Sequence, residues 1–430
     1  MLQTIQLSKL RQFCLKQIRD LKVGGWSVFF RKAGMFLKQL LFLIGIIVVA
    51  PLVCLIVALR SIVLVRFGTM RSNRIGHFST DVEAYLCASD HELKSHRKFD
   101  IICCPEPACN HQLQKMWART LKITPGVGWW TLLDRACMFW TRGNMHHIQL
   151  YSRSKDYKYF SIPNTHLCFT DEEHLQGQAI LKEFGIPSGG LWVCIHSRDS
   201  AYLDKSLGGD YAYHNYRDFN IQSLLMASEE LSRRGYYVLR MGAIVAEPLI
   251  SNNTKIVDYA TSSLRSDFAD MYLLAGCSAY IGSDAGIAGI PLIFRKPVSY
   301  INFSTTLISL IIDQGCYSFP FIMKHLWHKE KQRFLSLREM FEIGLAGASE
   351  TYLFEQAGIE PVCNTPEDIR ELAIEVDERL KGTWQPQFED DELQKQFWDI
   401  FRQYTPNDTM GDVKGRIGAA FLRKHKYLLG

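Results

Sequence analysis

The sequence predicts an α/β fold built from two doubly wound parallel sheets. Two observations predict this class. Short apolar runs that are typical of buried parallel strands alternate along most of the chain with segments of helical periodicity. The stretch 266–302 reads in order as helix, strand, small-residue turn, helix and strand, which is the repeating unit of a doubly wound sheet. At 430 residues the chain is also too long for a single hydrophobic core.

Changes in composition divide the chain into four predicted segments. We expect an amphipathic helix and a hydrophobic membrane segment in 1–61, a first α/β domain in 62–186, and a second α/β domain in 187–385. Residues 187–190, rich in proline and glycine, predict the linker between the two domains. In 386–430 we expect helices that cross back to the first domain.

The net charge of +5 hides an asymmetry along the chain. Residues 1–74 hold twelve lysines and arginines against one acid, Asp20, whereas the remainder is acidic overall. A near-neutral body with a basic front end argues against a protein that coats nucleic acid. The twelve cysteines form no CxxC pair, which predicts reduced thiols in a cytoplasmic compartment rather than disulfides or a zinc site.

The basic front end is predicted to associate with a membrane. Residues 4–22 place apolar side chains on one helical face, as in a helix that lies in the interface of an anionic leaflet. Residues 40–59 carry no charge over twenty positions, enough to cross a hydrocarbon core of about 30 Å. Pro51 interrupts this run, and bases flank both of its ends, so its orientation is open. A re-entrant or monotopic insertion, a single span and a buried soluble helix are the alternatives.

In the first half, Arg74, Gly76 and His77 lie where a loop meets a predicted helix, shortly after the strand 62–67. The positive end of a helix dipole keeps a histidine at such a place neutral, and a neutral imidazole is fit to act as a general base. The sequence therefore offers His77 as a catalytic base. A capping or packing role is the alternative.

In the second half, polar side chains follow successive predicted strands. His196 and Arg198 come after the strand 191–195, and Arg240 and Gly242 end the next one. Because the carboxyl ends of parallel strands meet at one edge of a sheet, we expect these side chains to share a ligand crevice. Arginine is suited to a bidentate grip on a diphosphate.

A third strand, 279–281, leads into a turn of small residues. Such a turn bares backbone N–H groups at a helix start and suits a phosphate, although a tight turn with no ligand is the alternative. The loop 202–218, which precedes the next helix, is predicted to hold substrate. We therefore expect an anion site at this edge of the sheet. Its further residues are Gly282, Ser283, Asp284 and Gly286 in the turn, and Tyr216 and Arg217 in the loop, with Arg74 and Gly76 from the first half.

Several short motifs resemble an uncharacterised family of glycosyltransferases from bacterial surface-polysaccharide gene clusters. The match runs from about residue 60 to the end of the chain. His196-x-Arg198-Asp199 is also similar to the His-x-Arg motif with which fucosyltransferase-like enzymes hold a nucleotide diphosphate, but Asp199 stands where a second arginine is common. The family resemblance is carried by Arg74-Ile75-Gly76-His77, Tyr216-Arg217-Asp218, Arg240-Met241-Gly242, Gly282-Ser283-Asp284-Ala285-Gly286 and Gly415-Arg416-Ile417-Gly418-Ala419.

The resemblance implies a GT-B-like architecture, in which two Rossmann-like domains face a central cleft. It implies a nucleotide-sugar donor, a lipid-linked or polysaccharide acceptor, no metal and no cofactor. We expect inverting transfer with His77 as the base, while Arg198, Arg240 and the turn 282–286 hold the departing diphosphate. The expected location is the cytoplasmic face of the bacterial inner membrane. A nucleotide-sugar epimerase and an inactive membrane scaffold are the alternatives. The sequence leaves open the oligomeric state, the donor sugar and the nucleotide base of the donor.

Overall fold

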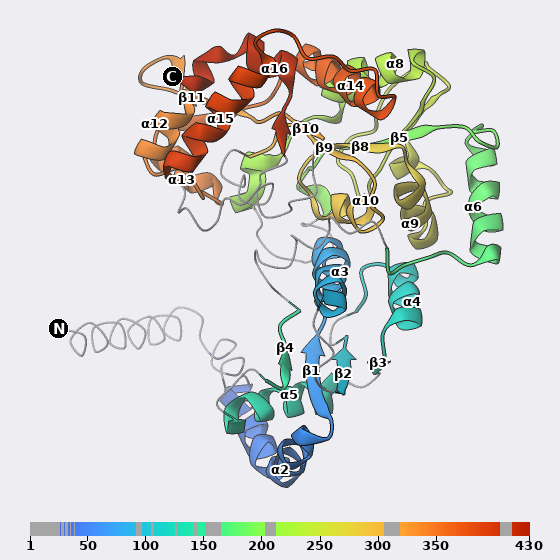
Figure 1. Cartoon of the computed structure of the whole chain (residues 1–430), viewed down its shortest axis with the longest axis vertical. Helices are drawn as coiled ribbons and strands as arrows, with labels where there is room; N and C mark the ends of the chain where they lie inside the picture. Colours follow the sequence, from blue (N-terminus) through green and yellow to red (C-terminus); the bar gives the residue numbers. More distant parts are fainter. Residues whose placement is uncertain are drawn as a thin grey trace. The chain divides into compact units, whose positions relative to one another are not determined.

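Figure 1 shows the whole chain as a computed structural model. The predicted amphipathic helix 4–22 and the loop positions 203–211 lie outside the described residues. The structure describes residues 26, 30, 33–34, 36–37, 39–91, 97–104, 107–124, 127–141, 145–150, 165–202, 212–304, 319–404 and 415–430.

The chain forms two compact units that do not follow its linear halves. Residues 70–93 and 106–123, predicted to belong to the first domain, group with the second half of the chain. The contact-defined units thus differ from the predicted domains, whose boundaries stay a prediction. Unit 1 comprises Met1–Thr69, Lys94–Pro105 and Thr124–Ile148, and unit 2 comprises Met70–Leu93, Glu106–Ile123 and Gln149–Gly430.

Unit 1 contains a small sheet of strand order β3-β2-β1-β4. Strand β1 pairs in parallel with β2 and with β4, which places Phe67 opposite Ile101. The strand predicted at 62–67 is therefore confirmed with a small shift in its ends. The elements are α2 (Ala50–Ala58), η1 (Leu59–Ser61), β1 (Leu64–Thr69), β2 (Lys98–Cys103), β3 (Ile123–Thr124), α5 (Val127–Thr141) and β4 (His147–Ile148).

The hydrophobic run in front of β1 forms two helices rather than one. Gln39–Val48 and Ala50–Ser61 meet at an angle of 48°. Pro51 lies in the first turn of α2, where its missing N–H breaks no helical hydrogen bond, so the predicted interruption is present. Within the described residues no single helix is long and apolar enough to cross a bilayer, whereas this bent pair meets that criterion together.

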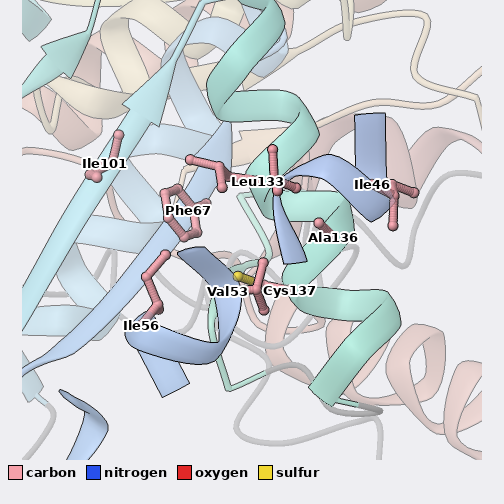
Figure 2. Packing of buried hydrophobic residues seen from close by; sticks show 9 residues of the cluster. Ile46, Val53, Ile56, Phe67, Ile101, Leu133, Ala136 and Cys137 are labelled. Atoms are coloured by element: carbon pink, nitrogen blue, oxygen red, sulfur yellow. The ribbon is translucent and has the colours of Figure 1, made fainter. Parts of the chain in front are cut away.

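One stripe of the bent pair belongs to the core of unit 1. Ile46, Val49, Val53 and Ile56 recur at helical spacing and are buried. Figure 2 shows this stripe against α5 and the strands of the small sheet. The other buried members of the cluster are Phe67, Ile101, Leu133, Ala136 and Cys137.

Unit 2 is built on a five-stranded parallel sheet of order β7-β6-β5-β8-β9. Helices α8 and α14 lie on one side of it, and α9 and α10 on the other (Figure 1). The predicted doubly wound parallel sheet is thus confirmed for this half. Its strands are β5 (Trp192–His196), β6 (Tyr237–Arg240), β7 (Ile256–Val257), β8 (Ala279–Gly282) and β9 (Val298–Tyr300).

Some of the helices of unit 2 begin with capping boxes. Thr170 and Glu173 form a capping box at α6, and Thr365 and Asp368 form another at α14. The predicted helix 287–294 is shorter than expected, because its first turn is the 3-10 helix η6. The helices are α3 (Ile75–His91), α4 (His111–Thr120), α6 (Asp171–Glu183), η3 (Ala212–Arg217), η4 (Ile221–Leu224), α8 (Leu225–Arg233), η5 (Tyr259–Thr261), α9 (Asp267–Gly276), η6 (Gly286–Ala288), α10 (Gly289–Ile293) and α14 (Pro366–Leu380).

The rest of unit 2 surrounds a three-stranded sheet, β12-β11-β13, with antiparallel pairing. The C-terminal helices α15 and α16, predicted to cross back to the first domain, pack against each other and against α12 and α14. These elements are β10 (Pro320–Phe321), β11 (His325–His328), β12 (Arg333–Phe334), α12 (Leu337–Glu342), α13 (Thr351–Gln356), β13 (Ile359–Val362), α15 (Asp390–Tyr404), β14 (Arg416–Ile417), α16 (Ala419–Lys424) and η8 (Lys426–Leu429).

Candidate functional site

The five-stranded sheet has a topological switch point between β5 and β8. The chain runs from β5 outward to β6 and β7, and then returns to add β8 and β9 on the other side of β5. Successive connections therefore leave in opposite directions, and a crevice opens at the carboxyl ends of these two strands. The register places His196 beside Gly282 at that edge. Ligands of doubly wound sheets bind at this place.

A cavity of about 440 Å³ lies at the switch point, and all the residues that line it belong to unit 2. Its wall combines the first turn of α3 with the segments that follow β5, β6 and β8. Most of the predicted site residues meet here although they come from distant parts of the chain. They are Arg74, Gly76, His77, His196, Arg198, Arg217, Gly242, Asp284 and Gly286.

Arg240 does not line this cavity. Its side chain is 1% exposed, and two of its nitrogens pair within the fold: Nη1 donates to Asp258 Oδ1 at 3.0 Å and Nη2 to the Glu247 carbonyl at 3.0 Å. The sequence predicts that Arg198 and Arg240 both bind a ligand. In the structure, however, Arg240 makes its contacts within the fold. Arg240 is the last residue of β6 rather than a residue beyond it, so its side chain remains among the elements packed around the sheet.

Three more predicted residues support the cavity from behind. The Ser283 hydroxyl lies 2.9 Å from His196 Nδ1, and Ser283 itself is 1% exposed. Gly282 packs so closely on β5 that a Cβ there would lie 2.4 Å from the His196 carbonyl oxygen. Tyr216 is buried, stacks near Phe354 and accepts a hydrogen bond from the Lys324 ammonium on its backbone carbonyl at 2.9 Å.

The glycines of the central turn serve a close contact between helices. A Cβ on Gly76 would lie 2.9 Å from Gly286 Cα, and a Cβ on Gly289 would lie 2.5 Å from Ser79 Oγ. Small residues at both positions let the first turn of α3 approach η6 and α10 backbone to backbone. Gly286 therefore has a packing role in addition to the phosphate role that the sequence predicts for its turn. The same contact places His77, in the first turn of α3, at the cavity wall.

His77 is oriented by a carboxylate one helical turn further along α3. Its Nδ1 lies 3.0 Å from Asp81 Oδ2, and the Asp81 side chain is 7% exposed. Because an ionised carboxylate only accepts, this contact favours the neutral tautomer with its proton on Nδ1, which leaves on Nε2 the lone pair that a general base needs. The predicted helix start at His77 is confirmed, whereas Asp81 was missed. The spacing of four residues on one helix could have revealed it.

Three arginines bring positive charge to the same cavity. Arg198 donates to Asp218 and to the His214 carbonyl, the latter at 3.1 Å. Arg217 donates from Nε to Asp284 Oδ1 at 3.1 Å. Arg74 is exposed, and its side chain forms no ion pair or hydrogen bond within the described residues. Of the three guanidinium groups at the cavity, that of Arg74 has no partner among the described residues, whereas those of Arg198 and Arg217 pair with carboxylates.

The pKa values of His214 and His196 reflect the electrostatic character of the cavity. Burial, followed by Arg217, Arg198 and Arg74, lowers the pKa of His214 to about 4. Burial, followed by Arg240 and Arg198, lowers the pKa of His196 to about 3. Both imidazoles are neutral at pH 7, first because burial disfavours their charged form and then because the guanidiniums around them disfavour a further positive charge. The cavity therefore has the potential that attracts an anion.

Two buried polar atoms at the cavity wall lack a partner among the described residues: His214 Nδ1 and Asp284 Oδ2. Buried polar groups are almost always hydrogen-bonded, so unsatisfied atoms at a cavity favour a ligand or ordered water there. His214 was noted in the sequence only as part of a loop. Its placement depends on η3, which the sequence does not reveal.

Two clusters elsewhere have the residue types of metal sites, but each already contains a cation. The Arg295 guanidinium lies 2.6 Å from Glu83, and the Lys424 ammonium lies 2.7 Å from Asp368. Ion pairing thus accounts for both clusters, and neither lies at the cavity. Their members are Glu83, Cys87 and His166 in one, and His325, Asp368 and His425 in the other.

No family model and no curated protein matches the chain. Two solved structures are similar to part of it. One is the glycosyl transferase family 9 protein from Veillonella parvula DSM 2008, at 10% identity and TM-score 0.34, covering 55% of this chain and 79% of that chain. The other is the ADP-heptose LPS heptosyltransferase II of E. coli, at 10% identity and TM-score 0.29, covering 55% and 84%. Both neighbours are glycosyltransferases, the class that the motifs predicted, but such low TM-scores carry no argument. The assignment below therefore rests on the site.

Proposed function

We propose that this chain is a glycosyltransferase that moves a sugar from a nucleotide-diphosphate donor to a hydroxyl of an acceptor. One observation carries the proposal: a carboxylate-oriented histidine and three arginines line a single cavity at the switch point of a parallel sheet. The switch point is where doubly wound sheets bind nucleotides. The cations suit a diphosphate, and the histidine suits the activation of a hydroxyl.

In the proposed reaction, His77 Nε2 takes the proton of the acceptor hydroxyl. The hydroxyl oxygen then forms a bond to the anomeric carbon of the donor, and the bond from that carbon to the diphosphate oxygen breaks. The electron pair leaves with the diphosphate, whose charge Arg74, Arg198 and Arg217 stabilise. Attack from the side opposite the leaving group inverts the anomeric configuration. The arginines supply the positive charge that a metal ion supplies in other transferases.

The acceptor and the location extend the proposal. We place the chain at the cytoplasmic face of the bacterial inner membrane, with a lipid-linked or polysaccharide acceptor in surface polysaccharide synthesis. The family resemblance, the basic front end and the apolar residues 40–59 support this. The fold proposed for the whole enzyme is GT-B-like.

The test is a comparison of His77→Ala with the parent chain. We expect nucleotide-diphosphate affinity and melting temperature to stay close to parental values, while turnover falls by about 10²–10⁴-fold. Asp81→Asn should also slow turnover, because an amide can hold the wrong tautomer of His77. His111→Ala, at an exposed histidine that begins α4, is the matched control and should change neither quantity.

The products of the same assay decide between the alternatives. A free sugar or an epimerised nucleotide sugar, formed without an acceptor, would favour the epimerase. Failure of every nucleotide diphosphate to bind the parent chain would favour an inactive scaffold. A His77→Ala variant that is stable and fully active would end the proposed mechanism.

A further inference from the structure

The bent helix pair of unit 1 is apolar on all sides, yet among the described residues only its inner stripe is buried. A helix that is hydrophobic all round is normally enclosed, either by protein or by lipid. Here the outward side chains form a continuous exposed run along both helices, far larger than the scattered apolar residues of an ordinary surface. We call this run the outer face. It comprises Leu37, Leu40, Leu41, Leu43, Ile44, Ile47, Val48, Leu52, Leu55 and Leu59.

Helix α5 adds aromatic rings next to the outer face. Trp129 and Trp140 are 66% and 49% exposed, and Phe139 is 62% exposed. The two tryptophans are eleven residues apart, about three helical turns, so they share one side of α5. Trp140 Nε1 donates to the Ile46 carbonyl at 3.4 Å, which sets this side against the first helix of the pair. Exposed tryptophans beside an aliphatic surface are typical of a membrane–water interface.

The charges of unit 1 complement an anionic surface. From Leu21 to Thr69 the sequence has six lysines and arginines and no acid. Among the described residues of unit 1 both carboxylates have a partner within the fold: Asp100 pairs with Arg66 at 2.7 Å, and Asp134 lies 2.8 Å from His147 Nδ1. The exposed bases Arg60 and Arg135 border the outer face, and the Arg135 guanidinium lies over the Phe42 ring at 5.1 Å.

We propose that the outer face lies in one leaflet of an anionic phospholipid bilayer, with the helix pair along the membrane surface and the tryptophans of α5 at the headgroup level. The inner stripe supports this orientation, because Ile46, Val49, Val53 and Ile56 form the core of unit 1 with the small sheet (Figure 2). A helix pair that crossed the bilayer would pull this stripe out of the core. A second copy of the chain is a poorer occupant, since it would bring equal basic borders together. This inference goes beyond the proposed reaction, because no substrate is needed to test it.

The experiment is flotation of the full chain with lipid vesicles after detergent removal. We expect the chain to float with phosphatidylcholine vesicles that contain phosphatidylglycerol, and to float less with phosphatidylcholine alone or at high salt. Trp129→Glu and Phe139→Glu should each lower the vesicle-bound fraction, roughly tenfold. Both side chains are exposed, so neither change disturbs the core. Leu175→Glu is the matched control, because Leu175 is 73% exposed on α6 of unit 2 and should not alter flotation.

Other outcomes would overturn the inference. A parent chain that floats with neither kind of vesicle has no lipid-binding face. If sedimentation shows a dimer that Trp129→Glu dissociates while flotation is unchanged, the outer face is an interface between copies. In intact membranes, peptide tags at the two ends of the chain should be cleaved by protease from the same side. Tags that report opposite sides would establish a crossing and exclude the surface orientation.

Discussion

The carboxyl ends of β5 and β6 look alike in the sequence and differ in the structure. Each strand is a short apolar run, and each is followed or ended by an arginine that the sequence offers as a diphosphate ligand. Arg198 lies two residues beyond β5, lines the cavity and contacts Asp218 and the His214 carbonyl. Arg240 is the last residue of β6 and is enclosed by Asp258 and Glu247.

This difference separates a binding group from a structural one. The Asp218 side chain is 23% exposed, so water can replace Arg198 as its partner. Asp258 is 12% exposed and has its other oxygen bound to the Leu249 N–H at 2.9 Å, so the loss of Arg240 leaves a buried charge without its partner. We therefore expect the same residue type to contribute affinity at one strand end and stability at the other. The predictions below test that contrast, beginning with the largest effect.

Arg240→Ala should destabilise the fold. Removing one partner of a buried ion pair costs about 3–5 kcal/mol of unfolding free energy, because the remaining carboxylate stays desolvated. Denaturant titration measures this, and the fraction that is still folded should bind nucleotide diphosphate as the parent does. Arg240→Met combined with Asp258→Asn removes both charges and should recover much of the loss. If folded Arg240→Ala protein bound the nucleotide diphosphate tenfold more weakly than the parent, Arg240 would belong to the binding site.

Arg198→Ala should show the opposite pattern. Loss of a charged hydrogen bond to the ligand costs about 1.5–3 kcal/mol, or roughly ten- to a hundred-fold in affinity. Calorimetry with a nucleotide diphosphate measures this, and the melting temperature should fall much less than in Arg240→Ala. Arg233→Ala is the control, since its side chain is 71% exposed and pairs only within α8. If Arg198→Ala bound the nucleotide diphosphate as tightly as the parent does, the carboxyl end of β5 would not belong to the proposed site.

Gly76→Ala tests whether the close helix contact positions His77, the proposed base. Its Cβ would lie 2.9 Å from Gly286 Cα, so the first turn of α3 must shift. Such overpacking costs about 1–3 kcal/mol of stability, and turnover should fall because His77 moves with that turn. Gly128→Ala on α5 is the control, because a Cβ there meets nothing within 4 Å. Unchanged turnover in Gly76→Ala would show that the contact does not set the position of His77.

The smallest expected effect is a pH dependence of donor binding. His214 has a pKa of about 4 because of burial and of Arg217, Arg198 and Arg74, with Asp284 acting in the opposite direction. A bound diphosphate brings negative charge and raises this pKa, so the complex holds more protons than the free protein above pH 4. Affinity should therefore rise as pH falls from 7 towards 5, by at most about tenfold for each pKa unit of the shift.

Calorimetry in buffers of different ionisation enthalpy detects this proton uptake. A nucleotide-diphosphate sugar is the appropriate ligand, because it lacks the terminal phosphate whose second pKa is about 6. His214→Gln should abolish the proton uptake and leave binding at pH 8 nearly unchanged. Proton release on binding, or uptake that persists in His214→Gln, would contradict the assignment of the anion site to this wall of the cavity.

Local patterns in the sequence determined much of the fold and part of the site. Strands, capping boxes and the helix start at His77 depend on neighbours within a few residues, so apolar runs and capping signals predict them. The edge of the sheet where His196 and Arg198 lie follows from the rule that parallel strands share their carboxyl ends. The interruption at Pro51 follows from the chemistry of one residue.

Only the tertiary structure decided which of these residues share a cavity. Arg240 is enclosed because Asp258, eighteen residues away, lies within 3.0 Å, and no local signal shows that pairing. The meeting of Gly76 with Gly286, more than two hundred residues apart, adds a helix contact to the turn that the sequence offers as a phosphate site. Unit 1 buries one stripe of a segment that is apolar on every side, because the described part of the fold supplies partners for only that side. In each case the physical reason is the same: burial and charge pairing depend on partners that are distant in sequence, and only the folded chain brings them together.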